Sequence, residues 1–446
     1  MTQETKQGNL ATIERARRVT AAEDYDIGTR FPAVYVRSDG SWMHDVEGNR
    51  VLDVTAASGA LLLGNRHPRV VEAITTCIRD YGTLFSSTLS LPRIEVAERL
   101  CERYPAAEKV VFWKSGSEAT SAAIRLARAA TGRDLILTCG YHGWHDWQRT
   151  YLNVGFDAGT RTACFGYSEA ALERLLSEFA GDVAGVFVTP EPAWFGVDYY
   201  RRLSDLCARH DVLFMIDEVI TGLRWGARGL NGTGGVRADV ITMSKGLSNG
   251  HSLSAVMGRR DVIDAYDLAG VSGTYTREVP SMAAALAVLD TIDDGSVHEQ
   301  CEKMGGLLMD GMRRVLADAD VPAHVAGPPM MFDVVVESEQ LSWDFYRAAF
   351  DYGAYFEDSG TQMVTAAFGE AEVEHALTAF EKGVRKVLST RKPGPVDEAR
   401  KRQFAAEAFG GVLAEDEASG ERIDQMMQAV ADRDTNLGGP AAPACG

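Results

Sequence analysis

The chain has 446 residues, of which 46% are hydrophobic and 24% are charged. These proportions are ordinary for a globular protein, and the length allows more than one domain. The net charge of −18 argues against a nucleic-acid partner. There is no apolar signal segment at the start and no apolar run of roughly 20 residues that could span a membrane. The 7 cysteines are scattered and include no Cys-x-x-Cys pair, which predicts reduced thiols in a cytoplasmic protein without a metal cluster.

In chain order, residues 1–30 are expected to be helical, and residues 34–53 to form a small antiparallel meander. From residue 68 onward, helical spacing alternates with short apolar strands. The predicted helices are 71–81, 94–104 and 118–130, and the predicted strands are 110–112, 135–137, 185–188, 213–216 and 240–242. This alternation predicts an α/β fold with a large, doubly wound, mostly parallel sheet.

Near residue 295 the pattern changes to that of a smaller α+β domain. It predicts helices at 299–318, 343–352 and 372–388, with strands at 331–336 and near Val364. The expected domains are an N-terminal segment of the small domain (1–65), the large domain (66–294), the C-terminal part of the small domain (295–392), and a helical extension with a disordered tail (393–446).

Two of the predicted strands lead into residues that carry chemistry. One runs into Lys245, and the strand before it ends at Asp217. A lysine amine can form a Schiff base with a carbonyl. An acid that holds a pyridine nitrogen is the usual partner of such a lysine when the carbonyl belongs to pyridoxal 5'-phosphate (PLP). The pair therefore indicates a PLP enzyme in which Lys245 and Asp217 are the catalytic residues.

Three other strand ends offer groups that suit the same cofactor. Residues 115–117 form a small-residue turn at the start of a helix, where unpaired backbone N–H groups and the helix dipole favour a phosphate. Tyr141 and His142 follow another strand, and the tyrosine can cover one face of a flat ring. Glu191 adds an acid after a further strand. In open α/β sheets ligands gather outside the carboxyl ends of strands, so five successive strand ends of this kind favour one shared site.

Each segment taken alone has a plainer interpretation. Residues 115–117 could be an ordinary helix cap, and residues 141–147 a packed aromatic loop in which the histidines are structural. The glycine run at 232–235 resembles part of a dinucleotide-binding loop. It has neither a strand before it nor a helix after it, so it is predicted to be a plain loop.

Together, these segments resemble the class III aminotransferases of the PLP fold-type I superfamily, especially the branch related to glutamate-1-semialdehyde aminomutase. The resemblance extends from around Phe31 to Leu388. It rests on six motifs, at residues 45–53, 115–120, 141–143, 217–224, 244–246 and 273–274. It implies the fold-type I architecture, with the smaller α+β domain built from both termini, and PLP as the cofactor.

The resemblance also implies a role for individual residues. Lys245 would be the Schiff-base lysine and Asp217 the partner of the pyridine nitrogen, with Val219 and Tyr141 on the two ring faces. Thr274 would reach the phosphate of the neighbouring subunit's cofactor, which implies a homodimer with shared sites. The remaining cofactor-binding residues would be Ser115, Gly116, Ser117, His142 and Glu191.

The chemistry of the two catalytic residues agrees with these roles. The pyridine ring withdraws electrons from a substrate carbanion only while its nitrogen is protonated, and the Asp217 carboxylate favours that charged form. Once a substrate amine has displaced Lys245, the lysine can move a proton between the substrate carbon and the cofactor's aldehyde carbon as general base and general acid.

The chain departs from the aminomutase pattern in three places. Residues 8–30 do not match an arm that carries an arginine for the substrate carboxylate, and residues 248–253 replace a glycine-rich mobile segment. Arg277 stands where the relatives have smaller residues, next to Glu278. Two interpretations of Arg277 are open: it binds a carboxylate, or it forms a plain surface or interface ion pair.

We predict an aminotransferase that moves an amino group from an amino donor to an aldehyde or ketone acceptor. By family analogy, the acceptor is an oxidised sugar or cyclitol in antibiotic biosynthesis. An aminomutase and an epimerase of an amine-bearing carbon begin with the same deprotonation and stay as alternatives. A non-catalytic binding protein is disfavoured by the presence of Lys245 and Asp217, and a nicotinamide dehydrogenase is supported only by the glycine run.

Overall fold

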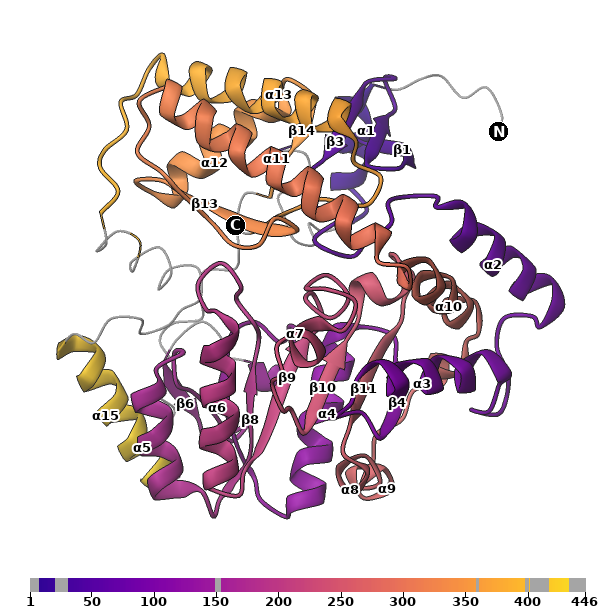
Figure 1. The fold of residues 1–446 in the computed structure, drawn as a ribbon, viewed down its shortest axis with the longest axis vertical. Helices are drawn as coiled ribbons and strands as arrows, with labels where there is room; N and C mark the ends of the chain where they lie inside the picture. Colours follow the sequence, from indigo (N-terminus) through magenta and orange to yellow (C-terminus); the bar gives the residue numbers. More distant parts are fainter. Residues whose placement is uncertain are drawn as a thin grey trace. The chain divides into compact units, whose positions relative to one another are not determined.

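The computed structural model describes residues 8–20, 31–148, 154–357, 361–397, 401 and 417–432. The chain forms two compact units, and both contain helices and β-sheet (Figure 1). The smaller unit comprises Met1–His67, Glu299–Lys401 and Ala442–Gly446, and the larger comprises Pro68–His298 and Arg402–Ala441. No helix within the described ranges is both long and apolar enough to cross a bilayer.

The larger unit is built on an eight-stranded sheet with the order β4-β11-β10-β9-β8-β5-β7-β6. Strands β10, β9, β8, β5 and β7 pair in parallel, whereas β11 is antiparallel to both β4 and β10, and β6 is antiparallel to β7. The predicted α/β fold with a mostly parallel sheet is therefore confirmed. The strands are β4 (Lys109–Trp113), β5 (Leu135–Cys139), β6 (Gly155–Asp157), β7 (Thr162–Cys164), β8 (Val183–Val188), β9 (Leu213–Glu218), β10 (Val240–Met243) and β11 (Ser254–Gly258).

Helices cover the sheet of the larger unit (Figure 1). They are α2 (Pro68–Asp80), α3 (Leu91–Arg103), α4 (Gly116–Thr131), α5 (Glu169–Phe179), α6 (Val197–Arg209), α7 (Gly229–Thr233), α8 (Arg260–Ile263), α9 (Tyr266–Ala269), α10 (Pro280–Ile292) and α15 (Glu417–Asp432), with 3-10 turns η1 (Asp146–Gln148), η2 (Lys245–Ser248) and η3 (Thr274–Arg277). Helix α4 packs closely on the sheet because its buried face is rich in small residues, such as Ala119, Ala123 and Ala127. Strands β4, β5, β8, β9 and β10 run in one direction, so their carboxyl ends meet along one edge of the sheet.

Several elements of the larger unit were not predicted from the sequence. Strands β6 and β7 have three residues each, too few to show a periodic pattern. Strand β11 lies buried between β4 and β10 although it consists largely of small residues. The expected loop at 232–235 was partly wrong, because Gly229–Thr233 form the short helix α7.

Among its described residues, the smaller unit combines two small sheets with four helices, of which α11 begins in the last residues of the larger unit. One sheet has the order β1-β2-β3-β14 and the other β12-β13-β15. The strands are β1 (Tyr35–Asp39), β2 (Trp42–Asp45), β3 (Arg50–Asp53), β12 (His324–Ala326), β13 (Met331–Val335), β14 (Ala354–Tyr355) and β15 (Gln362–Met363); the helices are α1 (Asn9–Arg17), α11 (Ser296–Asp318), α12 (Glu339–Phe350) and α13 (Glu370–Leu388). Helix α1 covers only part of the predicted helical segment 1–30, of which residues 1–7 and 21–30 lie outside the described residues.

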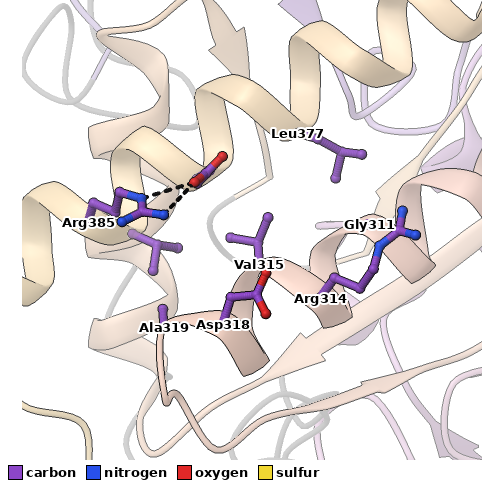
Figure 2. Close-up of a pocket in the computed structure, with 9 residues that line it drawn as sticks. Gly311, Arg314, Val315, Asp318, Ala319, Leu377 and Arg385 are labelled. Carbon is purple, nitrogen blue, oxygen red and sulfur yellow. Dashed lines mark hydrogen bonds and ion pairs between the residues drawn. The ribbon is translucent and has the colours of Figure 1, made fainter.

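A pocket of about 230 Å³ opens between α11 and α13 of the smaller unit (Figure 2). Gly311 permits the close approach of these helices, since a Cβ there would lie 2.2 Å from Leu377 Cδ1. The charged groups around the pocket include Arg385, which is paired with Glu381 at 2.7 Å. None of the predicted site residues lines this pocket.

Helix α15 belongs to the extension after residue 393 and packs against β6, at the edge of the large sheet. It buries Ile423, Met426 and Val430, and Arg174 binds Asp424 at 2.6 Å. An edge strand presents unpaired backbone groups, and a covering helix is one way to protect it. The predicted disordered tail after residue 432 lies outside the described residues.

Candidate active site

Asp217 lies at the carboxyl end of β9 and is almost fully buried, with 2% of its surface exposed. Its Oδ2 accepts a hydrogen bond from His142 Nδ1 at 2.9 Å, and its Oδ1 accepts from the Val219 backbone N–H at 3.0 Å and the Thr242 hydroxyl at 3.1 Å. Thr242 is placed there by the parallel register of β10 on β9, which aligns it with Asp217. An ionised carboxylate offers about four acceptor positions, so these three bonds leave one for a further donor.

His142 follows β5 and orients the Asp217 carboxylate. Its ring stacks on Phe187 with 4.3 Å between the ring centroids and lies 5.7 Å from the ring of Trp147. A carboxylate only accepts hydrogen bonds, so the proton of this contact is on His142 Nδ1. His142 Nε2 is buried and has no hydrogen-bond partner among the described residues.

The turn at residues 115–117 follows β4 and begins helix α4. Ser115 is the N-cap and forms a capping box with Glu118: its hydroxyl accepts from the Glu118 N–H at 3.2 Å, while Glu118 Oε2 accepts from the Ser115 N–H at 2.9 Å. The Ser115 side chain is thus used within the cap. The backbone N–H groups of Gly116 and Ser117 have no intrahelical partner and lie at the positive end of the helix dipole, which suits an anion.

Two glycines allow the strand ends to converge on this turn. A Cβ at Gly116 would lie 2.9 Å from Val219 Cγ1, and a Cβ at Gly143 would lie 2.2 Å from Ser117 Oγ. Gly143 also has a φ of +100°, which favours glycine. The residues after β4, β5 and β9 therefore lie in contact, and any larger residue at either glycine would push the turn at residues 115–117 away from its neighbours.

Lys245 follows β10 and begins η2 with a φ of +47°. For a residue with a Cβ this left-handed conformation costs roughly 1–2 kcal/mol. Such strain is characteristic of functional positions, where the surrounding structure holds a residue in an unfavourable conformation. The side chain is half-buried. Since Met243 pairs with Glu218, Lys245 lies near the end of β9, next to the segment that carries Asp217.

The remaining predicted residues lie on the same unit in different environments. Tyr141 is 53% exposed, and its carbonyl accepts the Thr189 hydroxyl at 2.8 Å. Glu191 follows β8 and is half-buried, and its backbone N–H donates to the Tyr200 hydroxyl at 2.7 Å. Thr274 begins η3 and is exposed.

Thr242 and Thr189 were not predicted as site residues. Both lie near the carboxyl ends of parallel strands or just after them, and their hydroxyls orient the Asp217 carboxylate and the segment after β5. Thr242 could have been found by aligning the ends of the two predicted strands, which pairs it with Asp217. Thr189 gave no comparable signal, because its contact depends on how the chain turns after β5.

Arg277 and Glu278 bond to different partners. Arg277 Nη1 donates to the Ser86 carbonyl at 2.7 Å, and Glu278 Oε2 pairs with Lys114 Nζ at 2.7 Å. The described contact of Arg277 is with a backbone carbonyl, so both interpretations of this residue stay predictions.

Glu218, beside Asp217, is fully buried and faces helix α7. Its oxygens accept from the backbone N–H groups of Leu230 and Asn231, each at 2.9 Å. Burial raises the pKa of Glu218 from 4.5 to about 7, although these hydrogen bonds oppose the shift. Because the pKa of Glu218 is higher in the folded protein than in the unfolded chain, protonated Glu218 favours the folded state. Its contribution to the free energy of unfolding is complete below pH 4.5 and is lost as the pH rises through 7.

This shift predicts a pH dependence of stability. The free energy of unfolding should fall by about 3 kcal/mol between pH 5 and 8 as Glu218 loses its proton. This figure follows from the pKa shift at about 1.36 kcal/mol per pKa unit. Glu218→Gln should flatten this slope, with a constant loss of stability from an amide that faces backbone donors. Urea unfolding at several pH values measures this dependence. If the wild-type protein and Glu218→Gln lost stability equally with rising pH, Glu218 would not be the group responsible.

The chain is similar to known proteins over most of its length. A family model described as aminotransferase class-III matches residues 25–155 and 160–382. A 2'-deamino-2'-hydroxyneamine transaminase of Streptomyces kanamyceticus is 37% identical over 327 residues, which are 72% of this chain and 82% of the relative. A glutamate-1-semialdehyde 2,1-aminomutase of Methanothermobacter thermautotrophicus is 32% identical, covering 77% of this chain and 90% of the relative. A solved structure described as a transaminase with PLP bound superposes with a TM-score of 0.77 at 27% identity, covering 85% of this chain and 97% of the other.

Proposed function

Because the chain belongs to the class III aminotransferases, we propose that it moves an amino group from an amino-acid donor to an oxidised sugar or cyclitol. The predicted family, the fold-type I architecture, the PLP cofactor and the aminotransferase activity are confirmed. The choice of acceptor is supported by the relative from Streptomyces kanamyceticus, which is named for a neamine derivative.

The described residues fit PLP. The free N–H groups at the start of α4 suit its phosphate, and the remaining acceptor position on the buried Asp217 suits a protonated ring nitrogen. Val219, held against Gly116, is assigned to one face of the ring and Tyr141 to the other. When bound, PLP supplies an electron-withdrawing ring that stabilises negative charge on the substrate carbon.

Lys245 is assigned the proton transfer. Its amine takes a proton from the substrate carbon as general base and returns it as general acid, a role that typically contributes 10²–10⁴-fold to the rate. The strained backbone at Lys245 fixes where the side chain starts, next to the end of β9. The Val219 N–H, the Thr242 hydroxyl and His142 all donate to Asp217 and hold its carboxylate in place.

We propose further that the enzyme is a homodimer in which Thr274 completes the partner's site. The support is an exposed apolar surface on the larger unit, along α2, the following loop and α3. It comprises Val71, Ile78, Tyr81, Leu84, Leu89, Leu91 and Ile94, each between 42% and 73% exposed. A groove of about 670 Å³ lies among α2, α3 and α10. Contiguous apolar surfaces of this kind are typical of interfaces. Light scattering should give twice the chain mass, and Leu89→Arg with Leu91→Arg should shift it toward the monomer.

The function is tested with an amine-transfer assay. Purified protein with PLP, glutamate and a panel of ketone-bearing sugars and cyclitols should release the keto acid of the donor in step with an aminated product. Lys245→Ala is the matched control. The glutamate-1-semialdehyde aminomutase relatives at about a third identity favour a second candidate, an isomerase. An isomerase would convert an amine-bearing substrate without any release of keto acid, and that result would reject the transfer.

A further inference from the structure

Lys114 and Glu278 form an ion pair within the larger unit. Lys114 Nζ lies 2.7 Å from Glu278 Oε2 and 3.3 Å from Ser281 Oγ. The two charged side chains are only 18% and 17% exposed, which sets them apart from the many ion pairs at the surface. This ion pair is therefore shielded from water and salt more than the surface ion pairs are. Removing one partner would leave the other as a poorly solvated charge.

The lysine end of this pair is attached to the turn at residues 115–117, which is assigned to the cofactor phosphate and is here called the phosphate turn. Lys114 immediately precedes the N-cap Ser115, and its backbone N–H donates to Glu118 Oε2 at 3.0 Å, within the capping box. A shift of Lys114 therefore moves the cap that presents the N–H groups of Gly116 and Ser117.

The glutamate end is attached to the segment that carries Thr274. The Glu278 N–H donates to the Tyr275 carbonyl at 3.1 Å, and its carboxylate accepts from the Ser281 N–H at 3.1 Å at the start of α10. Gly273 packs near the end of β4, since a Cβ there would lie 3.6 Å from the Trp113 ring. The residues from 273 to 281 thus form one braced segment, here called the 273–281 segment.

A third active-site segment faces the same pair. His251 follows the turn that begins at Lys245. Burial lowers the pKa of His251, Glu278 opposes that shift, and Lys114 adds to it. Both charges of the pair therefore act on the loop after the catalytic lysine.

We propose that the Lys114–Glu278 pair is a positioning device that couples the two cofactor sites of the dimer. It ties the phosphate turn of one site to the 273–281 segment, whose Thr274 serves the other site. The inference rests on the proposed dimer with shared sites. Lys114 and Glu278 act through the phosphate turn and through Thr274, and neither is a catalytic residue.

The test measures PLP affinity by titrating the apo-protein. Lys114→Met and Glu278→Gln should each raise the dissociation constant about tenfold, and the double variant should be no weaker than the weaker single one, because both remove the same interaction. The charge swap Lys114→Glu with Glu278→Lys should recover part of the affinity. Lys109→Met is the matched control, because Lys109 begins strand β4, which Lys114 directly follows, and pairs with the exposed Asp264. The dissociation constant of this variant should stay within about twofold of the wild-type value.

Mixed dimers separate the coupling from a purely local effect. In a dimer of one wild-type and one Thr274→Ala subunit, one of the two sites should weaken. In a dimer of one wild-type and one Glu278→Gln subunit, both should weaken. Thermal unfolding of the apo-proteins checks that each variant folds, and light scattering checks the dimer independently. Additive losses in the double variant, or a single weakened site with Glu278→Gln, would overturn the coupling. A monomeric protein would instead reject the proposed dimer on which it rests.

Discussion

Lys245→Ala is expected to lose covalently held PLP and to lower the rate of amino transfer by about a thousandfold or more. The amine of Lys245 both attaches the cofactor and moves the proton, so its removal eliminates two functions at once. Borohydride reduction followed by peptide mass analysis should find the cofactor fixed at Lys245 in the wild-type protein and at no residue in the variant. A variant that retained turnover within about tenfold would show that another group moves the proton.

The backbone at Lys245 adds a second measurement to this prediction. At a φ of +47° an alanine is still strained, whereas a glycine is not. The free energy of unfolding of Lys245→Gly should therefore exceed that of Lys245→Ala by about 1 kcal/mol. Denaturant unfolding of the two variants measures this difference. Both variants should be equally inactive. Equal stability of the two would mean that the conformation at this position is not strained.

Asp217→Asn is expected to lower kcat/KM by about a thousandfold while the fold is kept. The amide oxygen can still accept from the Val219 N–H and the Thr242 hydroxyl, but the negative charge that stabilises a protonated ring nitrogen is gone. His142 would also have to move its proton to Nε2, which is buried and meets no partner in the part of the chain that the structure describes. Steady-state kinetics with a saturating cofactor concentration measures the loss.

The matched control for Asp217→Asn is Thr242→Val. It removes one hydrogen bond to the carboxylate at 3.1 Å and leaves its charge in place. The rate should fall by about ten- to a hundredfold, less than for Asp217→Asn, because one hydrogen bond to a charged group contributes roughly 1.5–3 kcal/mol. If the two variants were equally impaired, the orientation of Asp217 and not its charge would be what matters.

Much of the larger unit could be predicted from the sequence because its parallel strands are buried on both faces. Such strands appear as short apolar runs, and β5, β8, β9 and β10 were found in this way. Strand β11 was missed because a run of small residues such as Ser254 and Gly258 has no distinctive pattern. Its burial follows from the neighbours on either side, β4 and β10.

The sequence by itself determined the chemistry: a lysine and an acid at the ends of successive apolar strands, a small-residue turn before a helix, and the family to which these motifs belong. Residue type and spacing are enough for this, since parallel strands bring their carboxyl ends together. The tertiary structure alone decided how each group is held. The contact of Gly143 with Ser117, the support of Asp217 by His142 and Thr242, and the pairing of Glu278 with Lys114 all join residues distant in sequence. Such contacts depend on strand register and packing, which no local pattern encodes.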